Sequence, residues 1–260
     1  MEPTHADPGT FVTYRRDGAV ATITMDDGKR NAISPRMLRE LGAALDRAEA
    51  DGAIVVLTGR DGVLSAGFDL KTLRRGGAAA LAMVRGGFAL AQRLIDFPTP
   101  VVVACGGHAI AMGAFLLLAG DLRIVARGPF KLWANEVAIG LPIPAAALEI
   151  CRHRLSPAYL TRATLLAEPS TPENAIERGF ADEVVAPESL AEVARQRAEA
   201  LAQLDLAAHA VSKRRARGPL LRALRAARRR DTVSLVALGV RQALRRKPAR
   251  RPAPSPAAAD

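Results

Sequence analysis

Aromatic residues and cysteines are scarce in this chain of 260 residues: aromatics make up 4% of it, and the two cysteines are Cys105 and Cys151. Their spacing matches neither a metal site nor a redox motif, so we expect a reduced, cytoplasmic protein that holds no metal. No apolar run reaches the ~18–20 residues of a membrane-spanning helix, which predicts no membrane span. The first ten residues, MEPTHADPGT, lack the basic and apolar regions of a secretory signal, so we expect none.

Acidic residues are scarce in the C-terminal quarter. The chain carries a formal net charge of +11 at pH 7, and residues 195–260 hold 17 Lys and Arg against 4 Asp and Glu. That segment therefore has a net charge of +13 and leaves about −2 for the rest. A basic segment can bind nucleic acid or a membrane surface. Few aromatics lie among these arginines and no nucleic-acid motif appears, so we expect no nucleic-acid partner.

Short apolar runs alternate with helical periodicities along most of the chain. Residues 11–25 alternate around an Asp17-Gly18 turn, which predicts a β-hairpin. Ser34 and Pro35 are typical of a helix N-terminus. The runs IVVLT and VVVA, which start at Ile54 and Val101, predict buried parallel strands.

After residue 195 the pattern is helical only, and we expect separate helices at 206–214 and 220–245. The order of elements predicts a layered α/β fold with a helical C-terminal part. The predicted organisation is a flexible N-terminus (1–10), an α/β core (11–195), a helical C-terminal region (196–247) and a disordered tail (248–260).

Two Gly- and Ala-rich loops of the same form follow the two predicted buried strands. The first is SAGFDL, residues 65–70, and the second is AIAMG, residues 109–113, which leads into the uncharged segment AFLLLA. A helix that is apolar on all sides is a buried helix, and its N-terminus presents free N–H groups. If the two loops meet, two backbone N–H groups can bind one oxyanion. A core helix with a tight preceding turn also explains the second stretch taken alone.

The segments KRNAIS, VVLTGRDGVLSAGFDL, GHAIAMGAFLLLAGDLRIV and NEVAIGLPIP, in this order and spacing, resemble the crotonase (enoyl-CoA hydratase/isomerase) superfamily over residues 11–250. The resemblance implies a ClpP/crotonase-like spiral of ββα units whose helical C-terminal region drives assembly into a homotrimer or a hexamer. It also implies binding of acyl-CoA or enoyl-CoA, with CoA as part of the substrate and no separate cofactor.

The resemblance assigns roles residue by residue. The backbone amides of Phe68 and Met112 would hold the thioester oxyanion, although the family most often has glycine at the second position. The residues expected to line the CoA, pantetheine and acyl path are Arg30, Ala32, Ala66, Gly67, Asp69, Leu70, Gly113, Phe115 and Trp133.

The hydratases of this family use two glutamates, and this chain keeps one of them. The first would fall on Phe115, which cannot titrate, whereas the second corresponds to Glu136 in an E-x-x-x-G pattern with Gly140. Water addition needs one group to activate water and a proton for the α-carbon, whereas moving a double bond from the 3- to the 2-position needs a single base. Because Glu136 adjoins Trp133 and the VAI run, we expect its carboxyl pKa to be raised.

We therefore predict an enoyl-CoA isomerase that converts a 3-enoyl-CoA to a 2-enoyl-CoA, with Glu136 as the single proton shuttle. Three alternatives stay open: a one-glutamate enoyl-CoA hydratase of fatty-acid metabolism, another enolate reaction such as decarboxylation or thioester hydrolysis, and a non-catalytic acyl-CoA-binding protein. The sequence does not indicate the acyl chain.

Several of these residues also have purely structural interpretations. Glu136 could be a solvated or capping carboxylate, and Phe115 could be either a core residue or a wall of the acyl pocket. We expect Asp69 to anchor its own loop and His108 to be packed rather than reactive. Lys213 belongs either to a solvated helix face or to a site for the CoA phosphates of a neighbouring subunit.

Overall fold

The computed structural model describes residues 9–245, with side chains described for residues 9–232. The predicted flexible N-terminus (apart from residues 9 and 10) and the predicted disordered tail lie outside the described residues. The strands are β1 (Val12–Asp17), β2 (Val20–Met25), β3 (Ile54–Thr58), β4 (Gly62–Ser65), β5 (Val101–Cys105), β6 (Gly107–Ile110), β7 (Leu122–Ala126), β8 (Leu132–Trp133) and β9 (Glu183–Val185). The α-helices are α1 (Pro35–Ala50), α2 (Leu70–Arg75), α3 (Gly77–Ile95), α4 (Met112–Ala119), α5 (Ala145–Arg154), α6 (Pro157–Thr164), α7 (Ala175–Arg178), α8 (Leu190–Leu201) and α9 (Leu206–Arg245). The 3₁₀ helices are η1 (Val137–Ile139), η2 (Pro172–Asn174) and η3 (Pro187–Ser189).

The strands form two sheets. The larger has the order β1-β2-β3-β5-β7-β9, and all of its pairs are parallel except the β1–β2 hairpin that the sequence predicts. The smaller has the order β4-β6-β8 and is parallel throughout. Neither β4 nor β6 was predicted from the sequence, where both overlap the starts of the two Gly- and Ala-rich loops. Both strands have four residues and include glycine, so their pairing with each other, rather than any periodicity, defines them.

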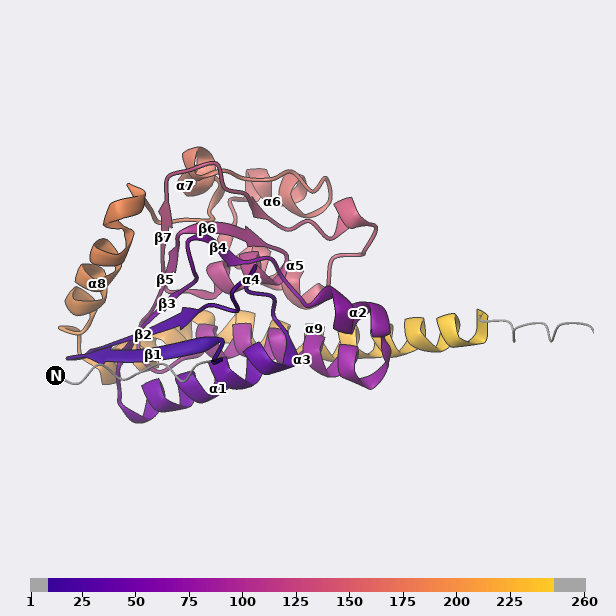
Figure 1. Cartoon of the computed structure of the whole chain (residues 1–260), viewed down its shortest axis with the longest axis horizontal. Helices are drawn as coiled ribbons and strands as arrows, with labels where there is room; N and C mark the ends of the chain where they lie inside the picture. Colours follow the sequence, from indigo (N-terminus) through magenta and orange to yellow (C-terminus); the bar gives the residue numbers. More distant parts are fainter. Residues whose placement is uncertain (1–8, 246–260) are drawn as a thin grey trace, which may run out of the picture.

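Helices cover both faces of the larger sheet. Helix α8 packs on one face against β3, β5 and β7, while α1, α3 and α4 lie on the other side (Figure 1). All eight residues of α4 are buried, as its uncharged sequence predicts. Helix α4 is therefore the central helix, and its N-terminus is held by the smaller sheet.

Local capping and turn geometry fix the starts of two helices, α1 and α3. Helix α1 begins after Ser34 as predicted, and the Ser34 side chain accepts a hydrogen bond from the Met37 N–H at 3.1 Å. Helix α3 begins at Gly77, immediately after α2, because the positive φ angles of Gly76 and Gly77 turn the chain within two residues.

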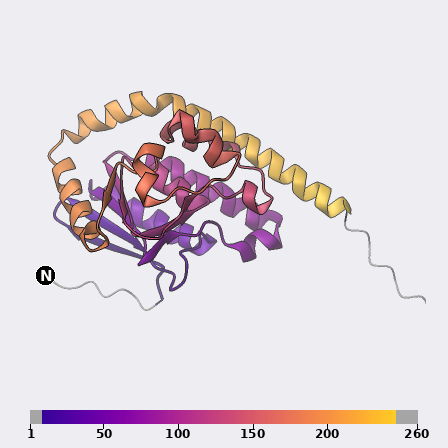
Figure 2. The ribbon, with the colours of Figure 1, turned by 90° about the horizontal axis from the view of Figure 1, so that it is seen from above.

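The two helices predicted at 206–214 and 220–245 are one continuous helix, α9, with Pro219 inside it (Figure 2). A proline removes one backbone hydrogen bond from a helix. Its cost is offset here by burial of Leu220, Leu221 and Leu224 on the face of α9 that packs against α3 and α5. Tertiary packing thus overrides the local signal for a break.

Asp121 anchors α9 to the central helix and the larger sheet. Its carboxylate accepts from Lys213 Nζ at 2.6 Å, from Arg217 Nη2 at 2.7 Å and from the Val101 N–H at 2.8 Å. The Lys213 side chain is 4% exposed, so both interpretations offered for it from sequence are wrong. Burial lowers the pKa of Lys213, and the adjacent Asp121 carboxylate opposes that shift.

One helix in the described part of the chain, α3, is long and apolar enough to cross a membrane by length and composition. Core helices of globular proteins meet the same criterion, and 44% of the most apolar window of α3 is buried inside the molecule. The helix packs against α1, α4 and α9 and carries Arg85 and Arg93. Length and composition alone therefore do not indicate a membrane span here.

Candidate functional site

The three residues predicted to be catalytic follow the ends of the three strands of the smaller sheet. Phe68 comes three residues after β4, Met112 two residues after β6, and Glu136 three residues after β8. The strands are parallel neighbours, so their carboxyl ends lie along one edge of the sheet. Ligands of parallel sheets bind at this edge. The fold thus brings all three residues to one place.

The loop that carries Phe68 is fixed by two buried polar side chains. Asn31 is fully buried with φ of 51°, and its Nδ2 donates to the Met25 carbonyl at 2.8 Å and to the Leu64 carbonyl at 3.2 Å. The Ser65 hydroxyl donates to the Asn31 carbonyl at 2.6 Å. The segment KRNAIS, which contains Asn31, was quoted only for the family resemblance, and Asn31 itself was given no role. The available signal was an Asn in a turn-rich segment, since Asn tolerates positive φ better than most residues.

The two Gly- and Ala-rich loops touch each other. A Cβ added at Gly67 would lie 2.9 Å from the Ala111 Cβ and 3.4 Å from the Met112 amide nitrogen. At Gly113 an added Cβ would lie 2.2 Å from the Ser65 carbonyl oxygen, so α4 approaches β4 more closely than any side chain would allow. Ala111 has φ of 50°, and its N–H donates to the Trp133 carbonyl at 2.8 Å.

Two backbone N–H groups are free beside this contact. Met112 opens α4, so its N–H has no partner within the helix. Within the described residues the N–H of Phe68 also donates no hydrogen bond. The Met112 side chain is fully buried, and its sulfur would lie 3.4 Å from a Cβ added at Gly87 on α3. The methionine side chain therefore occupies the core and leaves its own N–H available.

The residues expected along the CoA path surround these loops. The Arg30 carbonyl accepts from the Ala66 N–H at 3.0 Å, the Arg30 side chain is exposed, and Leu70 is 55% exposed. Asp69 caps α2 through the N–H groups of Lys71 and Thr72, and hydrogen bonding from the Thr72 hydroxyl lowers the pKa of its carboxyl. This confirms that Asp69 anchors its own loop.

Ala32 and Trp133 are two more of the residues expected along the CoA path. The Ala32 N–H donates to Asp27 at 3.0 Å. The Trp133 indole N–H donates to the Ala167 carbonyl at 2.7 Å, which fixes the ring at the end of β8. The roles of these residues in binding CoA stay predictions.

A row of three phenylalanines runs inward from the loop that carries Phe68. The rings of Phe68 and Phe88 meet edge to face with centroids 6.1 Å apart, and those of Phe88 and Phe115 stack at the same separation. Phe115 is 1% exposed, and a Cβ added at Gly87 would lie 2.4 Å from the Phe68 ring. Gly87 and Phe88 were not predicted to be site residues, because a helical pattern in the sequence does not indicate which partner its residues face.

Glu136 is buried and lacks a hydrogen-bond partner for one oxygen. Its side chain makes no capping bond to η1, the residue is 8% exposed, and Oε2 has no partner among the described residues. Burial raises the pKa of Glu136 to about 7, in the predicted direction. The solvated and capping interpretations are therefore wrong. A carboxylate held this way is suited to exchange a proton near neutral pH.

Other titratable residues near the site have structural partners. His108 Nδ1 accepts from the Lys131 N–H at 3.1 Å, and its ring meets Phe130 edge to face, so His108 is packed as expected. Cys105 and Cys151 are fully buried, and burial raises the pKa of both thiols. Among the described residues, no group of three or more His, Cys, Asp or Glu could hold a metal ion.

Gly67→Ala tests the contact between the two loops. Gly67 has φ of +92° and an added methyl group would press on Ala111, so we expect the amides of Phe68 and Met112 to move apart. The expected result is a loss of roughly 10²-fold in kcat, as for removal of one oxyanion donor.

The matched control is Gly28→Ala, because Gly28 has φ of +73° and nothing within 4 Å of an added Cβ. It should cost a similar amount of stability and leave the rate unchanged. Equal losses of rate in the two variants would show that backbone strain, rather than the loop contact, controls activity.

Comparison with known proteins agrees with this architecture. The chain matches the sequence profile of the enoyl-CoA hydratase/isomerase family over residues 15–243. It is 32% identical to a carnitinyl-CoA dehydratase of Salmonella arizonae over 192 residues, which cover 72% of this chain and 73% of the relative.

Solved structures give the same result. A protein of Mycobacterium tuberculosis, solved both as a probable enoyl-CoA hydratase and as an enoyl-CoA isomerase, is 46% identical, with TM-scores of 0.84 and 0.82. The two structures cover 90% and 88% of this chain, and the chain covers 98% of each. The human mitochondrial Δ3-Δ2-enoyl-CoA isomerase is 25% identical with a TM-score of 0.84, over 90% of this chain and 93% of that one. The predicted α/β fold of ββα units with a helical C-terminal region is confirmed, and the chain belongs to the enoyl-CoA hydratase/isomerase (crotonase) family.

Proposed function

We propose that this protein isomerises a 3-enoyl-CoA to the conjugated 2-enoyl-CoA with Glu136 as the single proton shuttle. Two features together carry the proposal. Glu136 is buried and its Oε2 has no partner among the described residues, and the position of the first hydratase glutamate is occupied by the apolar Phe115. One acid-base group at the site suits a reaction that moves one proton.

The proposed reaction needs only groups that lie at the edge of the smaller sheet. The thioester oxygen accepts hydrogen bonds from the N–H groups of Phe68 and Met112, and ionised Glu136 removes a proton from the α-carbon. The electron pair delocalises into a dienolate whose charge rests on the thioester oxygen. Glu136 then returns the proton to the γ-carbon, which places the double bond between the α- and β-carbons and restores the free carboxylate.

A hydratase is the second candidate, because relatives with the names carnitinyl-CoA dehydratase and probable enoyl-CoA hydratase align with this chain. Glu136 alone would then have to activate water, and another source would have to supply the α-proton. Decarboxylation, thioester hydrolysis and pure acyl-CoA binding stay further alternatives. We also propose the homotrimer or hexamer and the cytoplasmic location expected from sequence.

The test runs two assays side by side. A 3-enoyl-CoA is followed by absorbance for the conjugated thioester, and a 2-enoyl-CoA is followed for loss of conjugation by hydration. The proposal predicts conjugation without hydration. Hydration at a comparable rate would instead favour the hydratase, and binding of CoA thioesters without turnover in either assay would favour another enolate reaction or a binding protein.

The pH dependence of kcat/KM is a further expected result. Glu136 must be ionised to accept the α-proton, and burial raises its pKa to about 7. The value of kcat/KM should therefore fall tenfold per pH unit well below pH 7 and level off above it. A rate that stays flat down to pH 5 would show that Glu136 is not the base in the free enzyme.

A further inference from the structure

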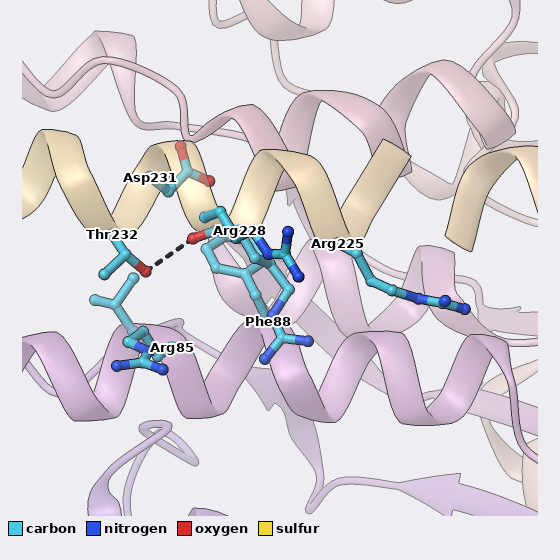
Figure 3. Close-up of a pocket in the computed structure, with 8 residues that line it drawn as sticks. Arg85, Phe88, Arg225, Arg228, Asp231 and Thr232 are labelled. Carbon is cyan, nitrogen blue, oxygen red and sulfur yellow. Dashed lines mark hydrogen bonds between the residues drawn. The ribbon is translucent and has the colours of Figure 1, made fainter. Parts of the chain in front are cut away.

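A basic cavity lies between helices α3 and α9. Its volume is about 440 Å³, and four arginines line it: Arg85 from α3 and Arg225, Arg228 and Arg229 from α9. Figure 3 shows the labelled residues approaching the space from the two helices, with Phe88 between them. Val84 and Phe88 supply an apolar wall. The cavity therefore combines an apolar wall with a cluster of guanidinium groups.

The positive charge of this cavity is not neutralised within the described side chains. None of the four arginines forms an ion pair there, although twelve other basic residues with described side chains do. The one acidic residue that lines the cavity, Asp231, accepts from the N–H groups of Ala145 and Ala146 at 2.8 and 2.9 Å and so caps α5.

Arg228 is held in place with part of its hydrogen-bonding capacity unused. Its Nη1 donates to Gln92 Oε1 at 2.7 Å, and its carbonyl accepts from the Thr232 hydroxyl at 2.8 Å, a bond drawn in Figure 3. The Nε atom is buried without a partner. Burial lowers the pKa of Arg228, and the like charge of Arg85 lowers it further. Two guanidinium groups that repel each other are stabilised when an anion binds between them.

The ring of Phe88 connects the cavity to the loop that carries Phe68. Phe88 lines the cavity and also meets Phe68 edge to face. The backbone of the same loop contacts Arg30 on the side expected to hold CoA, through the Ala66 N–H. A thioester bound at the Phe68 amide would thus have its CoA group on the side of Arg30. The basic cavity would lie on the opposite side, beyond the Phe68 ring.

We propose that this cavity binds a carboxylate at the far end of the acyl chain, so that the substrates are ω-carboxyacyl-CoA thioesters. This inference rests on the proposed function for the placement of the thioester. Carboxylate and phosphate share the chemistry that arginine recognises, so the phosphates of CoA itself are the other source of an anion. The position of the cavity on the ring side of Phe68 favours the acyl end.

The test measures binding of saturated thioesters in matched pairs by calorimetry: adipoyl- with hexanoyl-CoA, suberoyl- with octanoyl-CoA, and sebacoyl- with decanoyl-CoA. Members of each pair differ only in the terminal carboxylate. The proteins are the wild type, Arg85→Gln, Arg228→Gln and the control Arg215→Gln, which removes an exposed arginine of α9 outside the cavity. Unacylated CoA is titrated into each, and thermal unfolding checks that each variant folds.

The expected result is a wild-type preference for the carboxylated member of at least one pair. Each cavity variant should weaken that member roughly tenfold, as loss of a charge-assisted hydrogen bond does, and leave its uncharged partner unchanged. The control should change neither. Equal weakening of both members and of unacylated CoA would assign the arginines to the CoA phosphates and overturn the proposal. Unchanged affinities in both cavity variants would also overturn it.

The outcome is separable from that of the proposed function, because saturated thioesters bind but cannot isomerise. A carboxylate preference without turnover of any 3-enoyl-CoA would overturn the isomerase and retain the cavity. Isomerisation of a 3-enoyl-CoA without a terminal carboxylate, together with no preference for carboxylated thioesters, would overturn the cavity proposal and retain the isomerase.

Discussion

Glu136→Gln is expected to lower kcat for isomerisation of 3-enoyl-CoA by roughly 10²–10⁴-fold, the range typical of a lost positioned acid-base group. The amide has nearly the shape of the carboxyl group and cannot accept the α-proton. The backbone N–H groups of Phe68 and Met112 are unchanged by the substitution. The dissociation constant for the thioester should therefore change little. A non-catalytic acyl-CoA-binding protein would instead show no turnover in either form.

The same variant should be more stable than the wild type above pH 7. Burial raises the pKa of Glu136 in the folded state to about 7, from an ordinary value of 4.5. A raised folded-state pKa means that the stabilising contribution of the protonated carboxyl is fully present below about pH 4.5 and is lost as pH rises through about 7. Glutamine does not ionise, so the gap in melting temperature between variant and wild type should widen over this range.

Glu149→Gln is the matched control. Glu149 lies on α5, the next α-helix after Glu136, and pairs with Arg152 at 2.9 Å on the surface. It should leave both the rate and the pH dependence of stability unchanged. Full activity of Glu136→Gln would remove Glu136 from the mechanism. A rate loss without the gain in stability would mean that the carboxylate is better solvated than the structure indicates.

Asp121→Ala is expected to destabilise the protein by about 3–5 kcal/mol, the range for removal of one partner of a buried ion pair. The substitution leaves Lys213 and Arg217, whose side chains are 4% and 9% exposed, without their shared carboxylate. It also removes the acceptor of the Val101 N–H at the start of β5. Denaturant unfolding gives the change as a shift of the midpoint at constant slope.

Asp46→Ala is the control for this loss. Asp46 pairs with Arg93 at 2.6 Å, a distance like that of the Asp121–Lys213 pair, but its side chain is 72% exposed. Surface pairs contribute about 0–1 kcal/mol. Hydrogen exchange should also quicken in α9 of the Asp121 variant, since that carboxylate anchors the helix. Equal effects of the two substitutions would show that the Asp121 cluster does not hold α9 to the core.

The sequence predicted those parts of the fold that depend on local pattern. The hairpin at 12–25, the Ser34 cap and the uncharged α4 follow from turn chemistry, capping and composition, which act within a few residues. Strand β4 and the continuity of α9 depend on partners far along the chain. A four-residue strand that contains Gly62, and a helix that passes through Pro219, have local signals that point the other way.

The candidate site shows the same division. The two Gly- and Ala-rich loops were visible because each carries a glycine where backbone must approach backbone, and the structure gives that reason at Gly67 and Gly113. Asn31, Gly87 and Phe88 were not visible, because their contacts join segments that lie 30 or more residues apart in sequence or meet across helices. The basic cavity was not visible from sequence for the same reason, since Arg85 and Arg228 come together only when α3 and α9 pack against each other.

The central claim is that one carboxylate carries the proton from the α- to the γ-carbon. The most direct test is a single turnover in ordinary water of 3-enoyl-CoA that carries deuterium at both α-hydrogen positions, with the product analysed by mass spectrometry and NMR. If the buried Glu136 keeps the abstracted deuteron until it is delivered, part of the product carries deuterium at the γ-carbon. The Glu136→Gln variant should give no such product. A product with no deuterium at the γ-carbon, or a hydrated product, would contradict the single-base account.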